Sequence, residues 1–537
     1  VFIMLAITSG AALYGIDGFL VTVECTAERN LPEFEIVGLP DAAVRESELR
    51  MYTGARNCGF AIPELEVSVN LAPADRKKEG TALELAILCA IYQTCGVITP
   101  SCDMGTKCFI GEISFSGEVR SVRGVLGMTL AAIHAGKTEI FVPEANIGEA
   151  SVAETEGVSI YGVPDIPTLL WHLNGRERMV PSAADPFAHV AEPVFDVDFA
   201  EVKGQFRAKR AMEVAAAGGH NILLIGPPGS GKSMLAKRLP TILPPMHREE
   251  ALEATKIHSC AGMLSEELPY IQNRVFRSPH HSLSTAALVG GGKVPSPGEI
   301  SLAHHGVLFL DEFPEFRKDA MEALRQPIED RQVTITRAAG RVTYPADFLL
   351  VCAMNPCPCG YYGSRDEAHP CKCTEKAIAA YLEKISGPML DRIDIQMEMP
   401  ALSFAELSDA KPGEPSAEIR ARVTAARELA IRRSRESGTA GETVFSNSRL
   451  SGEALRRFCA LDSETTAVME DVFNRLHISA RAYDRILRVA RTLADLESVV
   501  RDGGTEQCGI LGGPIAKRHL LEAVQLRALD KKYFGGR

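Results

Sequence analysis

A glycine-rich loop between an apolar run and a helix-forming run constrains the fold of this chain more than any other feature. Residues 221–225 are apolar after the first, and the loop Gly226, Pro227, Pro228, Gly229, Ser230, Gly231, Lys232 and Ser233 follows directly. Glycines let backbone N–H groups approach phosphates, Lys232 can reach the β- and γ-phosphates, and Ser233 can offer its hydroxyl to Mg²⁺. Because residues 234–239 favour a helix, the order strand, loop, helix predicts a nucleotide-binding α/β core.

A second apolar run ends in two carboxylates. Residues 307–310 precede Asp311 and Glu312. Asp311 suits the metal, directly or through water, and Glu312 suits polarising an attacking water. An apolar run ending in Asp-Glu is common by itself, but beside the glycine loop it predicts ATP binding and hydrolysis with ATP and Mg²⁺ bound.

The length of the chain and its composition predict several domains. A chain of 537 residues is expected to form about three. Residues 1–175 alternate short strand-like runs with helical ones, residues 176–197 read as a polar linker, and residues 198–401 carry the motifs. Residues 402–537 are rich in Arg, Ala and Leu with helical periodicity, notably at 417–435 and 480–496.

Charge, thiols and hydropathy favour a cytoplasmic protein. The net charge of -11 neither supports nor excludes nucleic acid, because a local basic channel remains possible. Ten of the 14 cysteines are scattered without framework spacing, which indicates a reducing compartment. Residues 1–16 lack a basic start and are broken by polar residues and glycines, so we expect a buried first strand and no signal peptide. No run reaches the ~18 apolar residues of a membrane span, so we expect no membrane partner.

The other four cysteines form a cluster. Cys357, Cys359, Cys371 and Cys373 make two Cys-x-Cys pairs, with His369 as a possible substitute ligand. Four thiolates satisfy tetrahedral zinc with no open position, which is typical of a structural Zn²⁺ site. Two disulfides or free thiols are the alternatives, and the cluster can stabilise the region around Asn355 or touch DNA.

Several motifs together resemble a known family. They are Gly204-Gln205, Gly218-Gly219-His220-Asn221, the glycine loop, His280-His281, Gly290-Gly291-Gly292, residues 297–304 and Leu310-Asp311-Glu312. These resemble the magnesium-chelatase-like AAA+ ATPases, and nearly the whole chain is similar to the YifB/ComM group of bacterial proteins. The resemblance implies an α/β AAA+ core at 198–401, with a helix-2 insert and a hairpin before the first sensor. It also implies an α-helical lid at 402–537.

The resemblance assigns roles to three further polar residues. Asn355 ends an apolar run where AAA+ proteins keep the sensor that orients water against the γ-phosphate. Arg392 resembles the arginine finger that reaches a neighbouring subunit, and Arg481 resembles the second sensor of the lid. A finger supplied by a neighbour implies a homo-oligomeric ring, by resemblance a hexamer.

Alternating residues around Gly340 predict a β-hairpin, with Arg337 and Arg341 beside its tip. An ordinary surface hairpin is one alternative. In the family such hairpins project into a central pore and grip DNA phosphates, with His280, His281 and Lys293 as further candidates. The resemblance therefore implies a ComM-like DNA helicase that acts on single-stranded or branched DNA and promotes branch migration and DNA integration in natural transformation and recombination. A magnesium-chelatase-type subunit and a protein-remodelling ATPase are the alternatives.

Residues 1–175 resemble the α+β peptidase domain of the Lon family, which has the ribosomal S5 type 2-like fold. That family uses a Ser–Lys dyad. Here Ala82 stands in place of the nucleophile and Leu126 in place of the lysine. Thr81 has no obvious base, and we expect Lys77 and Lys78 to be solvated. A Ser–Lys mechanism needs both groups, so we expect an interaction or assembly module without peptidase activity.

An arginine-rich stretch in the lid has two interpretations. Arg420, Arg422, Arg427, Arg432, Arg433 and Arg435 lie close together in the sequence. Such runs usually form a solvated helix face, and a DNA-facing surface is the alternative.

Overall fold

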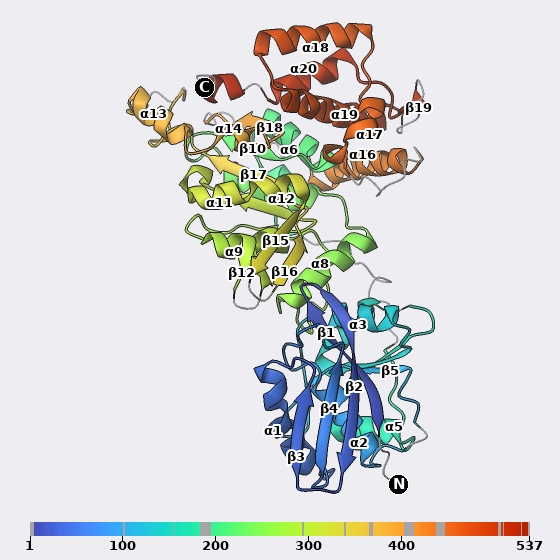
Figure 1. Ribbon diagram of the computed structural model, residues 1–537. Coiled ribbons are helices and arrows are strands. Elements are labelled where there is room, and N and C mark those ends of the chain that lie inside the picture. The colour runs from blue at the N-terminus through green and yellow to red at the C-terminus, as the bar shows by residue number, and fades with distance from the viewer. Residues whose placement is uncertain are drawn as a thin grey trace.

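The computed structural model describes residues 5–99, 102–153, 155–182, 195–292, 295–337, 340–364, 369–401, 413–436, 446–502, 506–507, 510–527 and 529–534. Figure 1 shows three parts in chain order, with the N-terminal part (blue) at one end, an α/β part in the middle and a helical part (orange to red) at the other end. Among the described residues, no helix has both the length and the hydropathy needed to cross a bilayer.

The described N-terminal part contains two larger sheets, a two-stranded sheet of β6 (Glu112–Ile113) and β7 (Val119–Arg120), and a buried helix. The first sheet has the order β1-β2-β4-β3, formed by β1 (Ala6–Tyr14), β2 (Asp17–Glu28), β4 (Glu66–Ala72) and β3 (Glu33–Val37). The second has the order β5-β8-β9, formed by β5 (Lys107–Phe109), β8 (Glu139–Pro143) and β9 (Ser159–Val163). Helix α2 (Glu84–Thr94) is buried along nearly all its length and packs on β1 and β2. The expected buried first strand is β1.

The described N-terminal part has four more helices, namely α1 (Ala42–Asn57), α3 (Val125–His134), the short α4 (Ile147–Ala150) and α5 (Ile166–Leu173). Helix α3 packs on β1 and β2 and also on α8 (Arg248–Cys260) of the middle part. The N-terminal part is therefore in direct contact with the middle part.

A five-stranded parallel sheet forms the middle part. Its order is β11-β14-β17-β10-β18, with β11 (Phe276–Arg277), β14 (Val307–Leu310), β17 (Leu349–Met354), β10 (Ile222–Ile225) and β18 (Ile395–Glu398). Strands β10, β14 and β17 are buried throughout, as expected for a parallel sheet covered on both faces. Since all the strands run the same way, the segments that follow β10, β14 and β17 meet at one edge.

Two insertions precede β14 and β17 in the chain. The first contains α9 (Thr285–Val289), β12 (Gly290–Gly291), β13 (Ser296–Pro297) and α10 (Glu299–Leu302). The second is the hairpin of β15 (Gln332–Arg337) and β16 (Gly340–Pro345). The Tyr344 hydroxyl donates to the Pro295 carbonyl at 2.9 Å, so the two insertions pack together. The expected helix-2 insert and hairpin are both present.

The turn between β1 and β2 touches this hairpin. The Tyr14 hydroxyl donates to the backbone carbonyl of Arg341 at 3.0 Å. Gly15, at φ +70°, approaches Val342 so closely that a Cβ would lie 2.7 Å from its Cγ1. Ile16 is buried in the same apolar cluster as Val342 and Tyr344. The N-terminal part therefore contacts the hairpin as well as α8.

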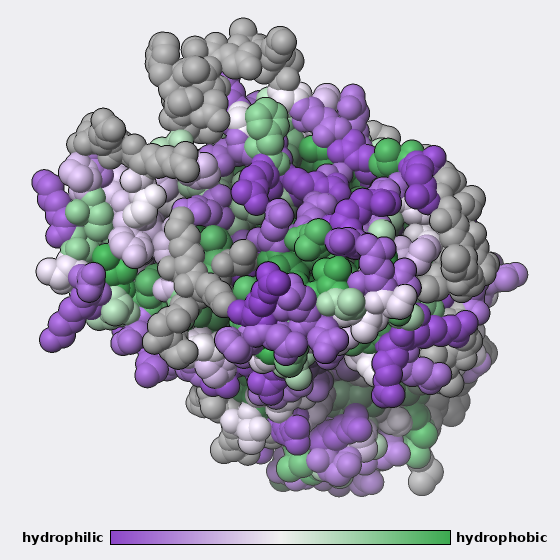
Figure 2. Space-filling view, turned by 90° about the horizontal axis from the view of Figure 1, so that it is seen from above, coloured by the Kyte–Doolittle hydropathy of each residue, from purple (hydrophilic) through white to green (hydrophobic). Residues whose placement is uncertain are grey.

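The C-terminal part is helical, as expected. Its helices are α16 (Ser416–Glu436), α17 (Gly452–Phe458), α18 (Ser463–Leu476), α19 (Ala480–Asp502), α20 (Lys517–Gln525) and α21 (Leu529–Phe534). Helices α16 and α19 pack on α6 (Phe206–Gly218), and their apolar faces share one core with a face of the parallel sheet. Viewed from the end where these helices lie, the surface is mainly hydrophilic with scattered apolar patches (Figure 2).

Two arginines of the stretch on α16 bind neighbouring segments, whereas Arg432 and Arg435 are exposed. The Arg427 guanidinium donates to the carbonyls of Ala216 and Ala217 near the end of α6. Arg433 is buried and pairs with Asp495 of α19 at 2.7 Å. Both predictions fail for these two arginines because the helix packs on neighbours that supply carbonyl and carboxylate partners.

Candidate nucleotide site and the cysteine cluster beside it

The glycine loop holds Lys232 at the carboxyl edge of the sheet. Gly229 and Gly231 have φ values of +76° and +90°, which favour glycine, and Lys232 begins α7 (Lys232–Arg238). Its Nζ donates to the carbonyls of Gly226 at 2.7 Å and Pro227 at 2.9 Å. Burial of this ammonium lowers the pKa of Lys232 to about 8. A bound phosphate would offer the ammonium a stronger, charged partner than these carbonyls.

Oxygen atoms suited to Mg²⁺ lie beside the loop. The Ser233 hydroxyl donates to Asp311 Oδ2 at 2.6 Å, and the other carboxylate oxygen accepts the backbone N–H of Glu312 at 2.9 Å. Hydroxyl and carboxylate oxygens are the ligands that Mg²⁺ prefers. Ser233 and Asp311 would therefore hold the ion. Glu312 follows with φ +51°, uncommon for a residue other than glycine and often found at functional positions.

The predicted sensor completes this arrangement. Asn355 directly follows β17, the neighbour of both β10 and β14. Its Oδ1 accepts a hydrogen bond from Lys232 Nζ at 3.2 Å. The structure therefore brings Lys232, Ser233, Asp311, Glu312 and Asn355 together, although they are spread over more than 120 residues of sequence.

A histidine contacts the carboxylate of Glu312. His281 Nδ1 lies 3.2 Å from Glu312 Oε2, and the His280 ring lies against the His281 ring, tilted by 33° with centroids 4.1 Å apart. The sequence predicts both histidines only as DNA-binding candidates. The signal for this contact is that they follow β11, the neighbour of β14, and so reach the same edge of the sheet as Glu312.

The candidate arginine finger and the candidate second-sensor arginine lie at the opposite edge of the sheet. Arg392 is buried, pairs with Glu329 at 2.7 Å and donates to the Pro388 carbonyl at 2.7 Å. Arg481 is exposed and lines a pocket of about 410 Å³ together with Asn221 and Asp394, which precede β10 and β18. Neither arginine therefore reaches the glycine loop of its own chain.

The basic candidates of the insertions are only partly described. Arg341 is exposed on β16, and its carbonyl accepts the Tyr14 hydrogen bond. Lys293 and the side chain of Arg337 lie outside the described residues.

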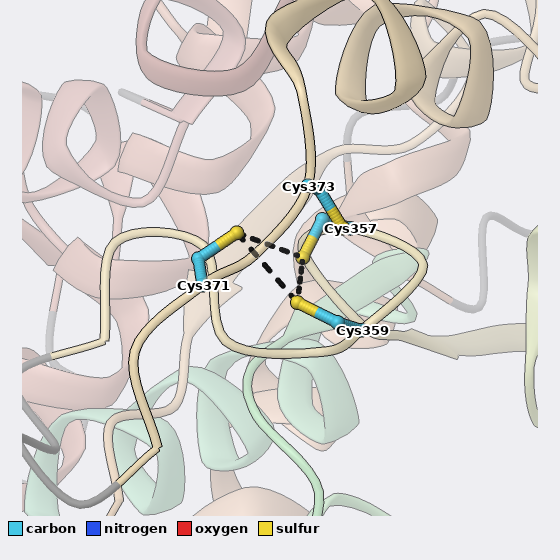
Figure 3. Close-up of side chains that lie close together, drawn as sticks. All are labelled: Cys357, Cys359, Cys371 and Cys373. Atoms are coloured by element: carbon cyan, nitrogen blue, oxygen red, sulfur yellow. Dashed lines mark hydrogen bonds between the residues drawn. The ribbon is translucent and has the colours of Figure 1, made fainter.

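The four predicted cysteines converge on one point (Figure 3). Their sulfur atoms are 3.3 Å apart for Cys357 and Cys359, 3.8 Å for Cys357 and Cys371, and 3.6 Å for Cys359 and Cys371. Cys373 completes the group, with all four sulfurs within 4.8 Å of one another. Tetrahedral zinc with bonds of about 2.3 Å requires sulfurs about 3.8 Å apart, whereas a disulfide requires about 2.05 Å. The spacing fits four ligands of one zinc ion.

The surroundings of the sulfurs also suit thiolate ligands. The Tyr362 backbone N–H donates to Cys357 Sγ at 3.3 Å. Burial disfavours the Cys359 thiolate, but backbone N–H groups of Tyr361 and Lys372 and the neighbouring thiols outweigh it and lower the pKa of Cys359 to about 6. The possible substitute ligand, His369, lies outside this group and stacks on the Tyr361 ring with centroids 5.3 Å apart. Backbone N–H groups thus support the thiolates of Cys357 and Cys359, whereas burial and the neighbouring thiols raise the pKa of Cys371 and Cys373.

A second group of residues that could bind a metal, Glu253, His304 and His305, forms a hydrogen-bonded network. Glu253 Oε2 lies 3.0 Å from His304 Nε2 and 2.8 Å from His305 Nε2. His304 Nδ1 accepts the backbone N–H of Asp347 at 2.9 Å. A neutral His304 therefore carries its proton on Nε2, where it donates to Glu253 and offers no lone pair to a metal.

The positions matched to a peptidase dyad are closed by packing. Ala82 is half-buried, and Leu126 is fully buried against Tyr270, with Leu252 beside it. Both neighbours belong to the middle part. The Leu126 backbone N–H donates to Glu149 at 2.8 Å, and the Ser259 hydroxyl of α8 donates to the same carboxylate. The lysine position therefore forms part of the contact between the two parts.

Lys78 departs from expectation. It is fully buried, and its Nζ donates to the Gly38 carbonyl at 2.9 Å and to the Pro73 carbonyl. The prediction of a solvated lysine is wrong here, because backbone carbonyls solvate the ammonium in place of water. Thr81 donates its hydroxyl proton to Glu112 at 2.5 Å.

Family models match three stretches of the chain. The model described as magnesium chelatase, subunit ChlI, matches residues 198–407, and that for its C-terminal part matches residues 413–507. A model described as subunit ChlI of Mg-chelatase matches residues 23–146. These matches fall in all three parts of the structure.

Individual relatives extend the similarity over the whole chain. The chain is 39% identical over 529 residues to the protein YifB of Salmonella typhimurium, covering 98% of each chain. It is 38% identical over 532 residues to the competence protein ComM of Haemophilus influenzae, again covering 98% of each. Lon protease 2 of Bacillus subtilis is 26% identical over 170 residues, 30% of each chain. The chain belongs to the YifB/ComM family of magnesium-chelatase-like AAA+ ATPases, a membership that implies ATPase activity.

Proposed function

We propose that this protein is a ring-forming, ATP-driven DNA motor that promotes branch migration and DNA integration during natural transformation and recombination. The observation that carries the proposal is an assembled ATP site in the same α/β part as a hairpin that exposes Arg341. Similarity to a competence protein over 98% of the chain supports the same proposal. Phosphate contacts carry no base information, so we expect little sequence preference.

Each residue of the site has its own role in ATP hydrolysis. Lys232 binds the β- and γ-phosphates, and Ser233 and Asp311 hold Mg²⁺, which neutralises developing charge when bound. Glu312 polarises the attacking water, and Asn355 orients it. His281 Nδ1 lies 3.2 Å from Glu312 Oε2 and competes with that water for the carboxylate.

Ring assembly supplies the two distant arginines. Arg392 and Arg481 lie at the edge of the sheet opposite the glycine loop, so they serve the site of a neighbouring subunit. Family members assemble as oligomers, and we propose a hexamer.

The decisive measurement is ATP hydrolysis with and without single-stranded and four-way-junction DNA. We expect DNA to stimulate the rate, and Glu312→Gln to abolish hydrolysis while ATP still binds. Strand displacement is the next assay. A rate that no DNA changes would remove the motor proposal and leave the ATPase.

The hairpin and the ring have tests of their own. Arg341→Ala should abolish DNA stimulation, whereas Arg45→Ala, at an exposed arginine on α1, should not. For the ring, Arg481→Ala and Glu312→Gln are mixed. Mixed rings contain interfaces where Arg481 of one variant meets Glu312 of the other, so partial activity should return. No recovery would argue against a trans role for Arg481.

The alternative functions are a magnesium-chelatase-type subunit and a protein-remodelling ATPase. Protein remodelling would favour an exposed aromatic or apolar side chain at the hairpin. The described hairpin residues instead expose Arg341, while Val342 and Tyr344 are buried. That arrangement suits phosphate better than polypeptide.

A second proposal concerns the metal. We propose that Cys357, Cys359, Cys371 and Cys373 bind one structural Zn²⁺, because their sulfur spacing matches a tetrahedral site and backbone N–H groups support the thiolates. Buried thiols such as Cys89 and Cys108 are unpaired, which suits a reducing cytoplasm. We also propose that the N-terminal part has no peptidase activity, since Ala82 and Leu126 cannot form the dyad.

A further inference from the structure

We propose that the cysteine cluster is a zinc clamp on the ATP site, so that metal occupancy sets the affinity of the protein for nucleotide. The inference rests on the proposed zinc site and deepens the proposed ATPase function. Three contacts carry it, and each joins the cluster to a residue of the nucleotide site.

The first contact is between the cluster loop and the glycine loop. Gly360 directly follows Cys359 and has φ +90°. A Cβ at Gly360 would lie 2.6 Å from Pro228 Cδ and 2.8 Å from its Cγ. Since real Cβ atoms do not approach other atoms so closely, the cluster loop supports the outer side of the glycine loop.

The second contact runs through the chain itself. Asn355 precedes Cys357 by two residues, and Cys357 is fully buried. Asn355 Oδ1 accepts a hydrogen bond from Lys232 Nζ. A metal that fixes Cys357 therefore restricts the backbone that carries Asn355.

The third contact comes from the other end of the cluster. Helix α13 (Glu375–Leu382) begins two residues after Cys373. Burial raises the pKa of its Tyr381 hydroxyl, and the neighbouring backbone N–H of Asn355 partly offsets that rise. Tyr381 also lies in the same apolar cluster as Cys357. Asn355 thus lies between the segment that enters the cysteine cluster and the helix that leaves it.

Loss of the metal should release all three contacts. Three sulfur pairs among Cys357, Cys359 and Cys371 lie 3.3 to 3.8 Å apart, so no covalent bond joins them. The cluster loop therefore depends on a shared ion for rigidity. The predicted consequence is weaker ATP binding, because Pro228 and Asn355 lose their fixed positions. Supporting residues around a bound ligand typically contribute about tenfold or more to affinity or activity.

The test uses the full chain without DNA and measures two quantities, zinc per chain and affinity for a fluorescent ATP analogue. We expect about one zinc in the unmodified protein. Removing it with a mercurial reagent and a chelator, followed by thiol to release the mercury, should weaken ATP binding about tenfold, and added ZnCl₂ should restore it. Because the same protein is measured throughout, recovery excludes irreversible unfolding.

Three variants separate the metal from its effect. Cys359→Ser should lose both zinc and ATP affinity. The matched control Cys102→Ser, at a half-buried thiol in the N-terminal part, should keep both. Gly360→Ala should keep the zinc and weaken ATP binding, because its Cβ collides with Pro228.

Each outcome decides one claim. Absence of zinc from the unmodified protein would overturn the zinc site. Zinc-free protein that binds ATP as tightly as the zinc-loaded protein would overturn the clamp alone. Neither result bears on the DNA motor, which is tested by DNA stimulation.

Discussion

The nucleotide site is open to solvent, whereas the region matched to a peptidase dyad is covered by packing, although both are built around a strand, a loop and a helix. At the nucleotide site, charged side chains line a loop open to solvent, and the Glu312 side chain is 58% exposed. In the N-terminal part, Ala82 and Leu126 occupy the matched positions, and the middle part covers Leu126 with Tyr270.

The difference shows what a retained catalytic site requires. A working site must leave room for substrate and keep its charged groups partnered but available. Once the nucleophile and the amine are replaced by apolar residues, the same region gains stability by packing. Here Leu126 and Glu149 form part of the contact with the middle part.

The largest expected effect is at the nucleotide site. Lys232→Ala removes the ammonium that binds the phosphates, and we expect ATP affinity to fall at least about 100-fold and hydrolysis to be lost. Lys237→Ala, at an exposed lysine on the same helix, is the control. Equilibrium binding of a fluorescent ATP analogue measures the change. Similar losses in both variants would mean that general charge, not Lys232, binds ATP.

The next change places a lysine at position 126 of the N-terminal part, which is matched to the dyad lysine of the Lon family. Leu126→Lys buries an ammonium against Tyr270, and we expect the free energy of unfolding to fall by about 3 kcal/mol or more. Leu126→Met keeps the volume and should cost less than about 1.5 kcal/mol. Urea unfolding measures both.

Combined with Ala82→Ser, the lysine should still give no peptide hydrolysis, because the region is closed. Casein cleavage by the double variant would show that peptide substrates can still reach this region.

The pH dependence of ATP binding tests the role of the Lys232 ammonium. In the free protein the pKa of Lys232 is about 8, below its usual 10.5, because burial disfavours the ammonium. Bound phosphate favours the ammonium and raises this pKa, so binding takes up a proton above pH 8. Affinity should therefore fall as pH rises above 8, by up to about tenfold per unit. Calorimetry at pH 9 in buffers of different ionisation enthalpy measures the proton uptake, and zero uptake would contradict the assignment.

The smallest effect concerns the contact between the two parts. Ser259→Ala removes a donor to the Glu149 carboxylate, whose pKa is already raised by burial. We expect a loss of about 1 to 2 kcal/mol in the free energy of unfolding. Ser463→Ala, at an exposed serine on α18, should change little. If the two variants melt alike, the Ser259 contact contributes nothing to docking.

Local patterns predicted much of the fold. The glycine loop, the Asp-Glu strand end, the hairpin and the long helices α16 and α19 each have a signal within a short stretch, and the structure contains them all. The convergence of the four cysteines was also predictable, because their spacing is short.

What the sequence could not predict depends on packing between distant segments. Arg433 pairs with a carboxylate far away in the chain, and Lys78 donates to backbone carbonyls. Charge patterning alone therefore predicts solvated side chains for both. Likewise, the pairing of His281 with Glu312 depends on β11 lying beside β14. Burial of Leu126 by the middle part required knowledge of how the two parts dock.

The contact between the β1–β2 turn and the hairpin has a mechanical consequence. Tyr14 holds the backbone of Arg341, and Ile16 is buried with Val342. A hairpin that moves with each round of hydrolysis must either carry the N-terminal part as cargo or break these contacts every cycle. Under the proposed motor function, the N-terminal part is therefore a load on the hairpin, and each step includes either the viscous drag on this part or the free energy of breaking these contacts.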